Sequence, residues 1–151
     1  MKKLFILGIV CLIGSVALAQ SSKAVKWTYS SKKVAAGVYE VSMTASVSGD
    51  YHIYAQNAGV EGPLPTVFTF TKNPLVTTEG KPKEVGKMVK KNEPVWGGDV
   101  NYYEKTVTFV QTVKVKGKSK TNLAGKVEFM VCNESECLPP SEVEFSVNIG
   151  G

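Results

Sequence analysis

The sequence predicts an all-β fold, an antiparallel β-sandwich of the immunoglobulin-like type. Most of the chain consists of short segments that alternate apolar and polar residues, which is the pattern of half-buried strands. Turn-forming residues separate these segments at regular spacing, so that about eight or nine short strands are expected. No stretch shows the sustained periodicity of an amphipathic helix. Together these three observations favour a sandwich over a helical domain.

The amino-terminal segment differs in composition from the rest of the chain. A basic start (MKK) precedes the apolar run Leu4–Val16, and Ala17–Ala19 is a small-x-small cleavage site. The apolar run is shorter than the roughly 20 residues that a membrane-spanning helix needs. We therefore expect a secretory signal peptide over residues 1–19, cleaved near Ala19, and a single mature domain over residues 20–151.

A signal peptide implies that the domain works in the periplasm or as a secreted protein. No later run approaches the length of a membrane-spanning helix, so no transmembrane segment is expected in the mature chain. Cys11 lies in the middle of the apolar run with no break in hydrophobicity before it, which disfavours a lipoprotein attachment site. The mature chain would then keep only two cysteines, Cys132 and Cys137.

The basic residues of the chain are all lysine. The chain has 18 lysines, no arginine and a net charge of +5. Removal of Lys2 and Lys3 with the signal peptide lowers the net charge to +3. Arginine is the preferred residue for bidentate phosphate and base-edge contacts, so a nucleic-acid partner is disfavoured. Lysines that alternate along strand-like segments instead indicate a solvated sheet face and edge strands that lysine protects from pairing with other chains.

The first three strands are expected to form a meander. In the second of them, four apolar residues fall on one face, and Gly49-Asp50 marks the turn that follows. The three predicted strands are Ala24–Ser30, Val38–Val47 and Tyr51–Gln56.

The middle of the chain mixes strands with irregular segments. A loop rich in Gly and Pro, Asn57–Pro65, precedes the clear strand Thr66–Thr71. Leu75–Thr78 is predicted as a short edge strand. Glu84–Lys91 is mostly polar and is predicted as either another short strand or an irregular segment.

A loop is predicted over Asn92–Asn101, which contains Pro94 and the glycine pair Gly97-Gly98. Within it the apolar pair Val95-Trp96 stands in a polar setting. An aromatic side chain on such a loop either packs back as a plug or is offered as a contact surface, and we favour the plug.

The last three strands lead to and away from the cysteines. The longest strand comes first, a lysine-rich turn at Gly117–Asn122 follows it, and the next strand runs directly into Cys132. These three predicted strands are Tyr103–Val115, Ala124–Val131 and Ser141–Ile149.

The cysteine pair is the strongest functional signal. Cys132 and Cys137 flank a short acidic loop, and Pro139-Pro140 stiffens the exit. Outside the cytoplasm such a pair can form a disulfide that persists. A bond across so short a loop constrains the unfolded chain by only about 2 kcal/mol on the loop-entropy model, which makes it a poor staple. This hints at a redox role, and an inert structural disulfide stays open as the alternative.

The loop between the cysteines predicts how reactive the pair is. Glu134 and Glu136 bring negative charge close to both sulfurs, which disfavours thiolates and raises the cysteine pKa values. A stabilised thiol makes the protein less reactive on its own. This suits a pair that waits for a partner's thiolate to attack.

Two other classes of function fit the same residues. The first is a non-catalytic β-sandwich adaptor in which the bond between Cys132 and Cys137 is structural. The second is a copper-binding module in which the cysteines, Met130 and His52 form a soft site. Nothing in the spacing requires copper, and His52 is more readily explained as a partly buried strand residue. We expect no cofactor and no metal.

At these residues the chain resembles the amino-terminal periplasmic domain of the thiol:disulfide interchange protein DsbD. The matching pattern is a strand, a cysteine, an acidic loop, a second cysteine and Leu-Pro-Pro, here VEFMVCNESECLPP (Val127–Pro140). Further similarity comes from DYHIYAQ (Asp50–Gln56), the Trp96-Gly97-Gly98 loop and the strand that starts at Tyr103. The resemblance covers roughly residues 25–149.

The resemblance implies an immunoglobulin-like fold in which Cys132 and Cys137 pass electrons to thioredoxin-fold proteins. In the family the second cysteine forms the mixed disulfide, which implies that Cys137 is attacked and Cys132 resolves. The family also has a cap loop with an aromatic that shields the pair, and tyrosines near the active site. The residues implied for these roles are Val95, Trp96, Gly97 and Gly98 for the cap, with Trp96 as the plug, and Tyr51 and Tyr54 for packing.

The sequence also departs from the family pattern. It ends at Gly151 without the membrane segments and thioredoxin-like domain of the family, so a separate membrane electron donor is expected as a partner. The loop between the cysteines is about one residue shorter than in the best-known member, and the cap aromatic is displaced.

Overall fold

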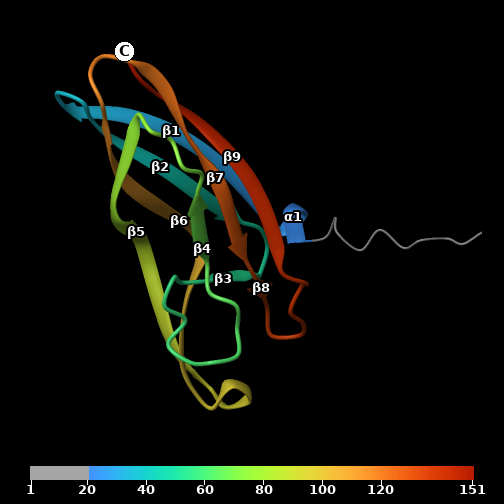
Figure 1. The fold of residues 1–151 in the computed structure, drawn as a ribbon. Helices are drawn as coiled ribbons and strands as arrows, with labels where there is room; N and C mark the ends of the chain where they lie inside the picture. The colour runs from blue at the N-terminus through green and yellow to red at the C-terminus, as the bar shows by residue number, and fades with distance from the viewer. Residues whose placement is uncertain (1–20) are drawn as a thin grey trace, which may run out of the picture.

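The structure, a computed structural model, describes residues 21–151 (Figure 1). The predicted signal peptide lies outside these residues. A four-residue helix, α1 (Ser21–Ala24), leads into the strands. These are, with one 3-10 helix, β1 (Val25–Ala35), β2 (Val38–Val47), β3 (His52–Tyr54), β4 (Val67–Phe70), β5 (Val76–Glu93), η2 (Pro94–Trp96), β6 (Gly98–Val115), β7 (Lys120–Phe129), β8 (Val131–Cys132) and β9 (Ser141–Gly150).

The strands form two antiparallel sheets. In the larger sheet β6 is central, with β5 along one side and β2 and β3 along the other. Strand β1 lies beyond β2, and β8 lies beyond β3. The smaller sheet has the order β4-β7-β9. This confirms the predicted all-β, antiparallel, immunoglobulin-like sandwich, and no helix among residues 21–151 is long and apolar enough to cross a membrane.

The main core lies between the two sheets. Strand β2 alternates as predicted, because Val41, Met43 and Ala45 are fully buried while the residues between them are more exposed. Each large apolar side chain buried in this way contributes about 1.5–3 kcal/mol. Trp27 joins the sheets, since its ring lies 6.0 Å from the Phe68 ring of the smaller sheet and also contacts rings of β6 and β7.

The segment 75–101 differs from the prediction. The predicted edge strand and the polar segment after it are parts of one 18-residue strand, β5, which pairs along nearly its whole length with β6. Most of the predicted loop Asn92–Asn101 is therefore strand, and only the turn at Pro94–Gly97 interrupts the pairing. The strand predictions were right in type but too short, and the loop prediction was wrong for most of residues 92–101. Most β5 side chains are exposed on both faces, so the sequence carries no alternation to mark the full strand.

The long β5–β6 hairpin projects beyond the body of the sandwich and carries η2 at its tip (Figure 1). Gly97 closes the tip with a left-handed backbone conformation, φ 73°, and its N–H donates to the carbonyl oxygen of Pro94 at 3.1 Å. A residue with a Cβ is disfavoured in that conformation, which explains a glycine here.

The strand predicted to run unbroken into Cys132 is divided in two. Strand β7 ends at Phe129 in the smaller sheet, and β8 begins at Val131 in the larger one. The chain thus changes sheets at Met130, which is 9% exposed and packs in a second apolar cluster with Cys132. This change of sheet places Cys132 beside β3.

Candidate functional site

The two cysteines form a disulfide that closes a short hairpin. Cys132 ends β8, and Cys137 faces it through an isolated antiparallel bridge. Inside the hairpin the Asn133 N–H donates to the carbonyl oxygen of Glu136 at 2.9 Å. Just outside it, the Leu138 N–H donates to the Val131 carbonyl oxygen at 2.9 Å. Backbone hydrogen bonds on both sides of the disulfide hold the hairpin closed.

The two sulfur-bearing residues differ in exposure. Cys132 is only 2% exposed and packs in an apolar cluster with Tyr54, Tyr102 and Met130. Cys137, opposite Cys132 on the other arm of the hairpin, is exposed. A molecule approaching from solvent therefore reaches the Cys137 residue first.

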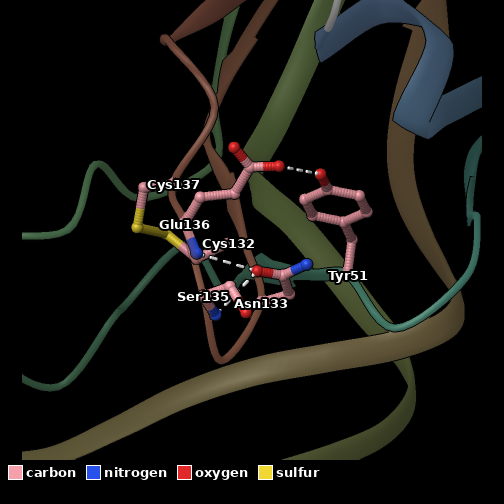
Figure 2. The surroundings of a disulfide bond; sticks show 6 residues. All are labelled: Tyr51, Cys132, Asn133, Ser135, Glu136 and Cys137. Carbon is pink, nitrogen blue, oxygen red and sulfur yellow. Dashed lines mark hydrogen bonds between the residues drawn. A yellow bond between two sulfur atoms is a disulfide. The ribbon is translucent and has the colours of Figure 1, made fainter.

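Asn133 organises the loop between the cysteines. Its Oδ1 accepts hydrogen bonds from the N–H groups of Ser135 and Glu136, each at 2.9 Å (Figure 2). This is the local turn that asparagine side chains favour. Its Nδ2 donates to the carboxylate of Asp50 at 3.2 and 3.3 Å. The loop is thereby anchored to the turn before β3.

Glu136, predicted to tune the cysteine pKa values, has a partner of its own. The Tyr51 hydroxyl donates to Glu136 Oε1 at 2.6 Å. This hydrogen bond is the main reason that the Tyr51 pKa is raised, with smaller contributions from burial and from the charges of Glu136 and Asp50. In Figure 2 the Glu136 carboxylate and Tyr51 lie on one side of the hairpin and the disulfide on the other.

Glu134, the other predicted tuning residue, pairs with the long hairpin. The Lys91 Nζ of β5 donates to Glu134 Oε1 at 2.9 Å and lies 2.9 Å from Glu93 Oε1. Hydrogen bonds to these two carboxylates raise the Lys91 pKa. The negative charge near the sulfurs is thus partly balanced, and its effect on the cysteine pKa values stays a prediction.

The tip of the β5–β6 hairpin carries the residues predicted as a cap. Trp96 is half-buried against the cluster that contains Tyr54 and Cys132. Its ring lies against Gly62, where an added Cβ would overlap the ring atoms. Val95 is 78% exposed. At the hairpin tip, the Trp96 ring is therefore packed against the protein, and the neighbouring Val95 side chain is exposed to solvent.

The rest of the predicted cap is backbone. Gly97 forms the turn described above, and a Cβ on Gly98 would lie 2.9 Å from Val60 Cγ1. The absence of a side chain at Gly98 lets the hairpin tip approach the Gly- and Pro-rich loop that follows β3. Tyr54, predicted to pack near the site, is 2% exposed beneath this arrangement.

A pocket of about 280 Å³ lies between the hairpin tip and the cysteine hairpin. Three elements line it: β3 through His52 and Tyr54, the hairpin tip through Glu93, Val95 and Trp96, and the whole of the cysteine hairpin 132–137. The structure thus brings together the predicted cysteines, the predicted glutamates and two of the predicted cap residues, Val95 and Trp96. Tyr51 lies apart from this pocket and contacts the hairpin through Glu136.

Sequence reasoning missed the position of His52. It pairs with Cys132 across one side of β3 and with Glu104 across the other. Its ring centroid lies 4.2 Å from that of Tyr102 and 5.2 Å from that of Tyr54. The motif DYHIYAQ marks a strand but carries no information on which strands flank it, so only the register reveals this neighbour.

A metal site was one alternative for the same residues. Within the described part of the chain, no group of three or more His, Cys, Asp or Glu side chains is arranged to hold a metal ion. Met130 and Cys132 share the apolar cluster, and both sulfurs of the cysteines are engaged in the disulfide. We therefore identify no metal ligands among residues 21–151.

Comparisons with known proteins bear on the site as a whole. A family model described as the N-terminal domain of the thiol:disulfide interchange protein DsbD matches residues 17–149. Among solved structures, the chain is similar to the DsbD N-terminal domain of Neisseria meningitidis in the reduced form. The two are 18% identical, with a TM-score of 0.57, over 89% of this chain and 92% of that one.

A second similar structure is the N-terminal periplasmic domain of ScsB from Proteus mirabilis. It is 15% identical, with a TM-score of 0.57, over 86% of this chain and 47% of that one. At these identities the likeness to the two structures concerns the fold. No curated protein sequence matches the chain.

Proposed function

The chain belongs to the family of the N-terminal domain of the thiol:disulfide interchange protein DsbD, and we propose that it is a periplasmic electron relay. In this role the Cys132–Cys137 pair passes reducing equivalents to or from thioredoxin-fold partner proteins. A disulfide with one exposed and one buried cysteine, set beside a pocket, is the observation that carries the proposal.

The difference in exposure supports a distinct role for each cysteine. When the domain is oxidised, a partner thiolate attacks the Cys137 sulfur, because Cys137 is exposed while Cys132 is 2% exposed. A bond forms between the partner sulfur and Cys137, and Cys132 leaves as a thiolate that takes up a proton. The partner's second thiolate then attacks the partner's first sulfur in the mixed disulfide, and Cys137 leaves as a thiolate that takes up a proton. The partner is left oxidised and the domain reduced.

Delivery of electrons is the same chemistry in reverse. The Cys137 thiolate attacks a partner's disulfide, which releases one partner sulfur as a thiolate and forms a mixed disulfide. The Cys132 thiolate then attacks the Cys137 sulfur, and the second partner sulfur leaves. The bond between Cys132 and Cys137 is restored, and a pair of electrons has moved to the partner.

The contacts of the cysteine hairpin support fast exchange. Asn133 holds the loop through its turn and through Asp50, so little backbone reorganisation is needed when the bond between the sulfurs breaks and forms. The hairpin tip with Trp96 and Val95 stands over the same pocket. We propose that this tip is the cap, that Trp96 shields the disulfide, and that a partner displaces it when it docks.

The location and partners of the domain follow from the same proposal. The predicted signal peptide at residues 1–19 would deliver the mature domain, residues 20–151, to the periplasm, and the similar ScsB domain is described as periplasmic. Thioredoxin-fold proteins are proposed as exchange partners. A separate membrane protein is proposed as the electron donor.

The reduction potential of the Cys132–Cys137 pair tests the proposal. Purified mature protein would be equilibrated with glutathione or dithiothreitol buffers of known potential. Exchange-active proteins have potentials of about −120 to −270 mV, whereas structural disulfides lie below about −300 mV. A value in the first range, with rapid exchange with a thioredoxin-fold protein, is expected. A much lower value without exchange would mean that the disulfide is structural.

The two single-cysteine variants test the assigned roles. In the Cys132→Ser variant, Cys137 can attack a partner's disulfide, but no second cysteine can resolve the mixed disulfide that forms. A stable mixed disulfide with a thioredoxin-fold partner is therefore expected. Cys137→Ser should trap no partner and transfer no electrons, while keeping the fold. Trapping through Cys132 in the Cys137→Ser variant would reverse the assignment.

A further inference from the structure

We propose that Glu104, His52 and Cys132 form an acid–base relay across three strands, in which His52 exchanges a proton with the Cys132 sulfur. This inference deepens the proposed function and rests on it, since the relay serves the step in which Cys132 closes the disulfide. It gives a role to the only histidine of the chain.

The strand register places these three residues in one row. His52 of β3 pairs with Glu104 of β6 on one side and with Cys132 of β8 on the other. Residues directly opposite in antiparallel strands point to the same face, with Cβ atoms about 4.5–5.5 Å apart. A carboxylate, an imidazole and a sulfur are therefore neighbours on one face of the larger sheet.

Two tyrosines position the imidazole in this row. The His52 ring lies against Tyr102, with ring centroids 4.2 Å apart and planes inclined at 33°, and meets Tyr54 edge-on at 5.2 Å. The same side chain lines the pocket that contains Cys132 and Cys137. The ring is thus held beside the sulfurs and still reaches the space where exchange takes place.

The surroundings of His52 favour a ring that is neutral at rest and that can accept a proton during the reaction. Burial is the largest influence and lowers the His52 pKa, so the ring favours its neutral form. Glu93 of β5, Glu104 of β6 and Glu134 of the cysteine hairpin act in the opposite direction, whereas Lys91 of β5 adds to the lowering. Once the ring gains a proton, these three carboxylates stabilise the imidazolium.

Cys132 needs such a partner more than Cys137 does. A thiol must lose its proton to become a nucleophile, and burial in apolar surroundings raises the pKa of a thiol. Cys132 is 2% exposed in an apolar cluster, so water has little access to its proton. Cys137 is exposed and can exchange its proton with solvent.

The proton and the electrons balance in the closing step. The Cys132 thiol gives its proton to a ring nitrogen of His52, which produces a thiolate and an imidazolium. The thiolate attacks the Cys137 sulfur of the mixed disulfide. The bond between Cys132 and Cys137 forms, the bond between Cys137 and the partner breaks, and the partner sulfur leaves with the electron pair. The imidazolium then returns the proton to the departing thiolate.

The first test measures the reactivity of the Cys132 thiol without any partner protein. In untagged Cys137→Ser protein, the rate of alkylation of Cys132 by iodoacetamide is followed as a function of pH. Adding His52→Phe, which keeps an aromatic ring against Tyr102, should slow alkylation roughly tenfold near neutral pH, because the thiol loses its general base, and should leave the rate unchanged at alkaline pH. His52→Gln should give the same result. Equal rates at neutral pH in the presence and absence of both substitutions would refute the relay.

The second test follows the rate of closure. Reduced protein is mixed with a large excess of oxidised glutathione, and the concentration-independent step reports attack by Cys132 on the mixed disulfide. His52→Phe should slow this step roughly tenfold near neutral pH, with the difference vanishing at alkaline pH where the thiol ionises unaided. Equal rates at every pH would contradict the proposal.

A third measurement needs no substitution at His52. Because the chain has one histidine, its ring protons give a single pair of resonances in an untagged protein. Their titration should differ between the oxidised protein and the reduced protein, and Glu104→Gln should lower the His52 pKa. Identical titrations in both redox states would overturn the relay. Rapid exchange with partners despite that result would leave the proposed function intact, so the two failures are distinguishable.

Discussion

Lys91 of β5 forms an ion pair with Glu134, the residue two positions after Cys132, at 2.9 Å between Nζ and Oε1. It links the projecting β5–β6 hairpin to the loop that closes the disulfide. The two side chains are 42% and 85% exposed, and pairs so open to solvent contribute little to stability. The link can therefore hold the two hairpins together across the pocket and still yield to a partner at small cost.

Glu134→Gln is expected to speed the reduction of the disulfide by the thiolate of dithiothreitol by about two- to fivefold. The substitution removes a negative charge that repels the attacking thiolate and also releases the link to Lys91. Stopped-flow reduction by dithiothreitol measures the rate. The gain should shrink as salt is added, because screening weakens interactions between exposed charges.

Glu142→Gln is the matched control for that experiment. Glu142 pairs with Lys126 at 2.7 Å on the smaller sheet, so the substitution removes an equal charge from an exposed pair outside the cysteine hairpin. Its reduction rate should equal that of the wild type. An equal acceleration in both variants would show that net charge matters and the position of Glu134 does not.

Trp96→Ala is expected to open the pocket and raise the rate of reduction by dithiothreitol at least about threefold. The ring is half-buried against the cluster that contains Cys132, so its removal also lowers the free energy of unfolding by about 2 kcal/mol. Trp96→Phe should have a rate of reduction and a free energy of unfolding close to those of the wild type. A rate unchanged in the alanine variant would mean that Trp96 does not shield the disulfide.

Gly62→Ala is expected to displace the Trp96 ring from its packed position. Gly62 has φ 132°, and a Cβ there would overlap the Trp96 ring. Gly80→Ala is a control with a positive φ of 61° but no atom near the new methyl group. The control should lose about 1 kcal/mol of stability from backbone strain alone. In urea unfolding, Gly62→Ala should lose more stability than Gly80→Ala, and it should also speed reduction of the disulfide. Equal losses of stability in the two variants, with an unchanged rate of reduction, would disprove the packing of Trp96 against Gly62.

Tyr29→Phe is expected to keep or raise stability at neutral pH, by up to about 1 kcal/mol, because the hydroxyl is buried without a hydrogen-bond partner among the described residues. Burial raises the pKa of Tyr29 to about 12, so the folded state favours the neutral phenol. The wild type should therefore lose stability as pH rises from about 10, the unfolded value, through about 12. The phenylalanine variant should lose less over that range.

Tyr103→Phe provides the contrast to that variant in thermal unfolding. The Tyr103 hydroxyl donates to Glu84 Oε2 at 2.9 Å, so its loss should cost about 1 kcal/mol at neutral pH. If Tyr29→Phe proved as destabilising as Tyr103→Phe, the Tyr29 hydroxyl would have a partner after all.

Most of the sandwich could be predicted because its strands carry alternating side chains. In β2, Val41 and Met43 face the core while their neighbours are more exposed, and β9 keeps Phe145 and Val147 inside. The β5–β6 hairpin could not be predicted in this way. Its β5 strand pairs on one side only and exposes most of its side chains, so backbone hydrogen bonds to β6 define it rather than a pattern of burial.

The sequence alone determined the fold class, the cysteine pair and the nature of the loop between them, because strand alternation and the spacing of Cys132 and Cys137 are local properties of the chain. The tertiary structure decided which residues surround the sulfurs. The change of sheet at Met130 places Cys132 beside His52, and the long hairpin brings Lys91 to Glu134. Strand order and register join residues far apart in sequence, and no local pattern specifies them.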